Sequence, residues 1–332
     1  MTLYENQYKG TMMRLGLALL FFEALFMLQG VVLRIAAVLL PLFFAPLASD
    51  VLYEVVGGLL YIATFCSPVV FFRVLSKKHV AIEPIRVSWR MPRETFPYIF
   101  FGLAVVSAAS YANALLVDLF AYREFNNEVL FDTSASSNVE LVLLFFTLAV
   151  IPAFVEEFLF RGLVLSNLLP YGRTTAILAS SVLFGIMHQN VGQLFYATAA
   201  GVVLGFVYVK TKSIWPCVLL HFCNNFRSVL QVGITDRLPA QTANVVLYTM
   251  EGVLLVAALI SAVYLFLRER DARVDVRRHG AFERELTPDE EYAERPIAPA
   301  RRLRLFFTPT IIAFLAFCGI QMLSLITLSF FS

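Results

Sequence analysis

Long apolar runs, each close to the length of a membrane span, constrain the fold of this chain most strongly. Of its 332 residues, 59% are hydrophobic and only 15% are charged, whereas soluble domains carry roughly 25% charged residues. A membrane-spanning helix needs roughly 20 apolar residues. That criterion predicts nine spans, at 15–45, 54–73, 96–118, 139–167, 174–190, 193–210, 214–231, 244–267 and 305–331. We therefore expect an all-α polytopic membrane protein, a bundle of about eight or nine spans. The three spans between 174 and 231 are short, so we expect them to be buried in the bundle or to be re-entrant.

Loop charges predict the orientation of the chain, because cytoplasmic loops carry an excess of Lys and Arg. The loop 73–93 has six basic residues and one acid, and the loop 119–137 has three acids and one arginine. The first is therefore predicted to be cytoplasmic and the second external. The segment 268–304 contains ten arginines and nine acids, which is typical of a solvated cytoplasmic linker. A net charge of +2 gives no indication of nucleic-acid binding, and the four cysteines form no CxxC pair that would indicate a disulfide framework or a zinc knuckle.

Two adjacent acids, Glu156 and Glu157, lie inside the apolar run 141–165. A charge at mid-bilayer costs roughly 2.5–3.5 kcal/mol, so an intramembrane ionisable cluster indicates a functional site. Arg161 follows Glu157 by four positions, so the two side chains share a helix face and can pair. Glu156 is rotated by about 100° from this face and has no local partner. We expect Glu157 and Arg161 to form a structural ion pair, and Glu156 to act as a general base.

Two of the four histidines, His188 and His221, lie in apolar spans. The fourth and fifth spans form a hairpin that turns near Gly172, and Glu156 and His188 each lie sixteen residues from this glycine. The two side chains should therefore reach about the same depth. His221 and Asn225 are four positions apart on the seventh span, and they lie about 10 to 17 Å along that helix. Three helices are thus predicted to present these groups at overlapping depths.

This set of groups suits the hydrolysis of an amide bond. A carboxylate can take a proton from water, imidazoles can orient the water or bind a divalent metal, and an amide can donate to a developing oxyanion. No GxSxG sequence is present, so a serine nucleophile elbow is not indicated. HExxH is also absent, which argues against a standard zincin.

Three motifs resemble those of the CPBP family, the intramembrane CAAX-processing and bacteriocin-processing proteases that are also called the Abi family. The family pattern is EExxxR, then FxxxH, then HxxxN or HxxxD. All three are complete and in order between residues 140 and 230, at Glu156–Arg161, Phe184–His188 and His221–Asn225. The resemblance implies that Glu156 activates water and that His188 helps to position it. It further implies that His221 and Asn225 complete the water site and oxyanion pocket, supported by Glu157, Arg161 and Phe184.

The resemblance also implies an activity, a location and partners. It implies a membrane endopeptidase that cleaves a membrane-associated, in some members prenylated, substrate in a bacterial cytoplasmic membrane. The family is classed with the metalloproteases, although a metal-independent, glutamate-activated water mechanism has also been argued. If a divalent metal such as zinc is bound, the candidate ligands are Glu156, His188 and His221. The expected partners are membrane lipid and a peptide or protein substrate, with no nucleic acid.

The predicted organisation places a CPBP-like catalytic core among other membrane spans. About three N-terminal spans occupy 1–135, the core 136–232, a further span 233–267, the charged linker 268–304 and a C-terminal span 305–332. Two other functions stay open at this point. A proton-coupled transporter or channel could use the buried Glu and His as a relay, although no internal repeat is apparent. A non-catalytic membrane scaffold is the other alternative, and the presence of every candidate catalytic residue argues against it.

Overall fold

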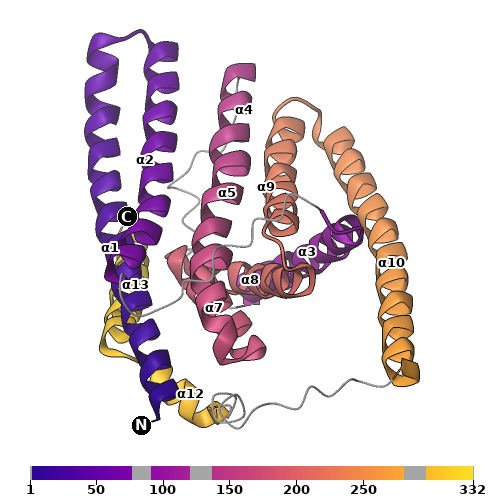
Figure 1. The fold of residues 1–332 in the computed structure, drawn as a ribbon. Helices are drawn as coiled ribbons and strands as arrows, with labels where there is room; N and C mark the ends of the chain where they lie inside the picture. The colour runs from indigo at the N-terminus through magenta and orange to yellow at the C-terminus, as the bar shows by residue number, and fades with distance from the viewer. Residues whose placement is uncertain (1, 77–90, 120–136, 280–296, 332) are drawn as a thin grey trace.

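A computed structural model describes residues 2–76, 91–119, 137–279 and 297–331. Over these residues the chain is built from helices and contains no strand (Figure 1). The predicted all-α class is therefore confirmed, and the protein is an integral, multi-pass membrane protein. Most of the residues in the loops 73–93 and 119–137 lie outside the described residues. The predicted orientation of the chain, which depends on their charges, stays a prediction.

Each of the nine predicted spans is helical. They correspond to α1 (Leu3–Phe43), α2 (Pro46–Leu75), α3 (Thr95–Leu119), the continuous run Asn138–Tyr171, α7 (Arg173–Met187), α8 (Val191–Thr211), α9 (Trp215–Thr235), α10 (Ala240–His279), and α12 (Pro299–Phe306) followed by α13 (Pro309–Phe331). Within the described residues, six helices are long and apolar enough to cross a membrane, or up to seven if the α12–α13 pair, bent by 70°, is one span. This is fewer than the eight or nine spans expected.

The difference in span count lies mainly in two helices of the core. α7 has 15 residues and is about 22 Å long, which is shorter than the roughly 30 Å of the hydrocarbon layer. α9 carries the polar side chains His221, Asn224 and Asn225, and it does not meet the criterion for an apolar span. Both helices pack inside the bundle, as expected for the short segments.

The first and last helices lie side by side at one edge of the bundle, and α10 forms the opposite edge (Figure 1). α1 and α2 form a hairpin, because the α1 ladder ends two residues after Pro41 and Pro46 opens α2 in its first turn. α12 crosses the beginning of α1, where Arg301 pairs with Glu5 at 3.0 Å. α10 continues to His279, so the beginning of the predicted linker 268–304 is helical. Its residues 280–296 lie outside the described part of the chain.

The run Asn138–Tyr171 alternates between α-helical and wider π-helical stretches. It comprises α4 (Asn138–Leu144), a π-helix (Phe145–Val150), α5 (Ile151–Glu157), a second π-helix (Phe158–Leu165), α6 (Ser166–Leu168) and a 3₁₀ turn (Leu169–Tyr171). π-Helical stretches are rare and are frequent at functional sites. The two acids thus end a short α-helix between two π-helices. Gly172 then makes the predicted hairpin turn at a φ of 126°, which non-glycine residues rarely adopt.

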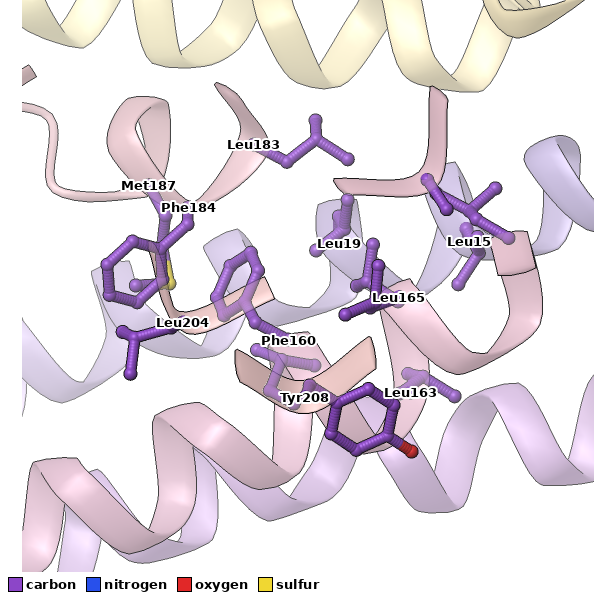
Figure 2. Packing of buried hydrophobic residues seen from close by; sticks show 14 of the residues in the cluster. Leu15, Leu19, Phe160, Leu163, Leu165, Leu183, Phe184, Met187, Leu204 and Tyr208 are labelled. Atoms are coloured by element: carbon purple, nitrogen blue, oxygen red, sulfur yellow. The ribbon is translucent and has the colours of Figure 1, made fainter. Parts of the chain in front are cut away.

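The apolar core includes side chains of α1, the second π-helix, α7 and α8. Figure 2 shows Phe160 of the second π-helix with Phe184 of α7 and Leu204 of α8, and Leu15 and Leu19 of α1 lie nearby. Phe160 and Phe184 meet edge to face, with ring centroids 5.1 Å apart. This packing fixes the elements that carry the candidate site.

Candidate active site

One cavity brings together the residues that the sequence singled out. It has a volume of about 80 Å³, which is room for a few water molecules. α3, α5, α7, α8 and α9 contribute its lining, which comprises Val106, Glu156, Phe184, His188, Tyr196, Ala197, Ala200, Leu204, Leu220, His221, Asn224 and Asn225. All four predicted catalytic side chains are in this set. Glu157 and Arg161 lie behind it.

Glu157 and Arg161 form a fully buried ion pair. Arg161 Nη1 lies 2.9 Å from Glu157 Oε1, and both side chains are 0% exposed. Arg161 Nη2 donates to the Gly201 carbonyl at 3.0 Å, and the guanidinium carbon lies 4.8 Å from the centre of the Phe184 ring. A cation over an aromatic face is stabilised electrostatically. Phe184 therefore contributes both apolar packing and a favourable face for this buried charge.

His221 connects the two glutamates. Its Nδ1 lies 2.9 Å from Glu157 Oε1, and its Nε2 lies 3.9 Å from Glu156 Oε2. Because a carboxylate can only accept a hydrogen bond, Nδ1 carries the proton and donates it to Glu157. Glu157 thus fixes the ring orientation of His221 in addition to balancing Arg161. No local spacing predicts this role of Glu157, because Glu157 and His221 are 64 positions apart in the sequence.

The two carboxylate oxygens of Glu156 have different surroundings. Oε1 accepts a hydrogen bond of 2.5 Å from the hydroxyl of Tyr61. Oε2 is buried and has no hydrogen-bond partner among the described residues. Glu156 has no partner on its own helix, as expected, but Tyr61 of α2 supplies one across a helix interface. Tyr61 belongs to no motif, and no local spacing indicates its contact with Glu156.

His188 follows the last residue of α7 and bonds back onto that helix. Its Nδ1 lies 2.8 Å from the Phe184 carbonyl oxygen, an acceptor, so Nδ1 is the donor and Nε2 is left able to accept a hydrogen bond in the neutral ring. The next residue, Gln189, has a φ of 51°, and its amide donates to buried Glu23 of α1. Glu23 also accepts from the thiol of Cys318 in α13, at 3.3 Å. The sequence analysis assigned no role to Glu23.

Asn225 is engaged with the backbone of the neighbouring helix. Its Nδ2 donates to the Leu148 carbonyl at 3.0 Å. In an α-helix this carbonyl would receive the amide hydrogen of Pro152, which proline lacks. Asn225 Oδ1 accepts from Asn224 at 3.1 Å, and Asn224 accepts from Tyr196 at 3.0 Å. Asn225 was expected to serve an oxyanion pocket, and one of its two amide hydrogens remains for that purpose. Tyr196 was not singled out from the sequence.

The predicted metal ligands do not form a metal-binding set as placed. In the described part of the chain, no group of three or more His, Cys, Asp or Glu side chains is arranged to hold a metal ion. The Nδ1 atoms of both histidines are hydrogen-bonded to Glu157 and to the Phe184 carbonyl. These bonds leave Nε2 of each ring open, as in many metal-binding histidines, so the hypothesis that Glu156, His188 and His221 bind zinc stays a prediction.

Comparison with known proteins agrees with the motifs. Residues 138–227 match the family model described as type II CAAX prenyl endopeptidase Rce1-like. A Bacillus subtilis (strain 168) protein named Putative membrane peptidase YdiL is 34% identical over 88 residues, which cover 25% of this chain and 35% of that protein. The likeness thus spans about a third of the relative. No solved structure matches the chain. These matches confirm the resemblance drawn from the three motifs, and they show that residues 138–227 of this multi-pass membrane protein are similar to a family of membrane endopeptidases.

Proposed function

We propose that the protein is an intramembrane endopeptidase of the CAAX-processing type. It hydrolyses a peptide bond of a membrane-associated substrate with water that Glu156 activates. One observation carries the proposal, namely that Glu156 lines the cavity and that its Oε2 is buried and lacks a hydrogen-bond partner in the described residues. A buried acceptor of this kind needs a donor, and a water molecule in the cavity supplies one.

The proposed reaction assigns each proton to a group that can hold it. Water donates to Glu156 Oε2, and Nε2 of His188 or His221 accepts its second hydrogen. As the water oxygen adds to the scissile carbonyl, Glu156 takes a proton. It then passes this proton to the leaving amine when the C–N bond breaks. The free amide hydrogen of Asn225 is available to the developing oxyanion.

The hydrogen bonds made by Nδ1 of the two histidines support these roles. Glu157 keeps the Nδ1 proton of His221 pointing away from the cavity, and the Phe184 carbonyl does the same for His188. Both rings therefore present Nε2 as the remaining nitrogen. Because Glu156 and His221 are buried, their interactions with the developing charges are stronger than they would be in water.

A cleavage assay tests the proposal. Protein purified in detergent is incubated with a prenylated CAAX peptide and with an unprenylated, membrane-anchored peptide. Glu156→Gln should lower kcat by roughly 10²- to 10⁴-fold, the range for losing a general base, and His188→Ala should lower it as well. Glu140→Gln is the matched control, because Glu140 caps α4 on the same helical run and does not line the cavity. Full activity of Glu156→Gln would rule out the mechanism.

The two peptides also separate substrate classes. Cleavage of the prenylated peptide alone would assign a prenyl-dependent activity, and cleavage of both would assign a broader membrane-anchored substrate. Proton flux through liposomes that depends on Glu156, without cleavage of either peptide, would instead favour the relay predicted as the alternative function.

A further inference from the structure

Tyr61 contacts the proposed base from outside the family-matched segment. It lies in α2, whereas the match covers residues 138–227. Its hydroxyl donates to Glu156 Oε1 at 2.5 Å, across 95 positions of sequence. α2 packs against α5, the short helix that ends at the two acids. The contact is thus made by helix packing between the N-terminal part of the chain and the core.

The ring of Tyr61 is held by other aromatic side chains. It stacks on Phe65, with centroids 4.4 Å apart and an interplanar angle of 30°. Phe65 meets Phe22 of α1 edge to face at 4.8 Å, and these two phenylalanines are 2% and 1% exposed. This chain of rings fixes the position of the hydroxyl. A phenylalanine at position 61 would keep the packing and would lose only the hydrogen bond.

The hydrogen bond makes the two oxygens of Glu156 inequivalent. The terminal torsion of a glutamate is broad and roughly two-fold, so a free carboxylate would exchange its oxygens between the cavity and the helix interface. Tyr61 occupies Oε1, which leaves Oε2 on the side of His221, 3.9 Å from its Nε2. Tyr61 itself does not line the cavity, so it reaches a substrate only through Glu156.

We propose that Tyr61 is a positioning residue of the active site, which holds one oxygen of Glu156 so that the other faces the nucleophilic water. This inference rests on the proposed function. It places part of the catalytic apparatus in α2, beyond the CPBP-matched segment. It also predicts that this part of the chain affects turnover rather than substrate binding.

Steady-state kinetics of Tyr61→Phe test the proposal. A hydrogen bond to a charged group is worth enough that its loss should lower kcat by roughly ten- to a hundred-fold, with KM unchanged. Tyr8→Phe is the matched control, because Tyr8 is 1% exposed and its hydroxyl has no hydrogen-bond partner in the described part of the chain. This control should keep both constants. A Tyr61→Phe variant with the kcat of the wild type, or with a change in KM alone, would overturn the positioning role.

A stability cycle tests the contact without relying on activity. The thermal midpoint is measured for Tyr61→Phe in the wild type and in a Glu156→Ala background. We expect Tyr61→Phe to lower the midpoint in the wild type only. In the Glu156→Ala background the Tyr61 hydroxyl has no carboxylate partner to lose. Equal shifts would refute the contact. A lower midpoint in the wild-type background only, found together with a wild-type protein that cleaves no peptide, would refute the proposed function. Tyr61 would then be a structural partner of Glu156 rather than a positioning residue.

Discussion

The same substitution at the two adjacent glutamates should have opposite effects on stability. Glu157 Oε1 accepts from both Arg161 and His221, and its Oε2 is buried without a partner among the described residues. Glu157→Gln would leave the Arg161 charge uncompensated at 0% exposure, and would place an amide NH₂ where no acceptor lies. Removing one partner of a buried ion pair costs about 3–5 kcal/mol.

Glu156→Gln removes a buried carboxylate that pairs with no Arg or Lys among the described residues and whose Oε2 lies 3.9 Å from His221 Nε2. An amide oxygen can still accept from Tyr61, and the NH₂ group enters the cavity. Since an unpaired buried charge is itself unfavourable, we expect stability equal to or above that of the wild type, with activity lost. Glu157→Gln should lose activity too, because His221 loses the carboxylate that orients it.

Thermal unfolding of both variants in the same detergent measures the contrast. A double variant, Glu157→Gln with Arg161→Met, serves as the control, because it removes the buried charge as well as its partner. It should recover part of the lost stability without recovering activity. If both single variants shifted the unfolding midpoint equally, or if the double variant were less stable than Glu157→Gln, the distinction between the two acids would be refuted.

Further predictions concern the backbone around the site. Gly201→Ala should lower the unfolding midpoint, because the new Cβ would lie 2.9 Å from the Cα of Ser181 and would separate α7 from α8. Gly252→Ala is the control, and it should leave the midpoint unchanged because no atom lies within 4 Å of the new Cβ. Equal midpoints for these two alanine variants would contradict the close approach of the helices. Gly172→Ala should destabilise the hairpin by about 1–3 kcal/mol, since its φ is 126° and its Cβ would meet Arg302 at 1.9 Å. A normal midpoint for this variant would show that the turn can adopt another backbone conformation.

The sequence predicted those parts of the site that depend on local helix geometry. The four-residue spacing of Glu157 and Arg161 indicated their ion pair, and equal distances from Gly172 predicted that Glu156 and His188 reach about the same depth. Apolar length located the helices, and the number of spans stays a prediction, since six or up to seven helices of the described residues are long and apolar enough to cross a membrane. The apolar run at 174–190 is close to the length of a span, but α7 itself has only 15 residues.

Contacts between distant helices could not be predicted in this way. Tyr61 reaches Glu156 because α2 packs on α5, and neither residue has a local feature that indicates the pairing. The bond from Asn225 to Leu148 depends on a carbonyl that Pro152 leaves without its α-helical donor. One residue of π-helical widening changes which side chains face a neighbour, so α-helical spacing alone does not place every side chain along the run Asn138–Tyr171.

The order of biosynthesis determines when the contacts among Glu23, Gln189 and Cys318 can form. Glu23 of α1 accepts from Gln189, the residue that follows His188, and from the thiol of Cys318 in α13. During synthesis from the N-terminus, the core helices enter the membrane well before α13 has been translated. The surroundings of His188 are therefore completed only when the final helix has been inserted. A nascent chain that still lacks α13 would lack the bond from Cys318 to Glu23, so the timing of translation sets when this side of the candidate site is completed.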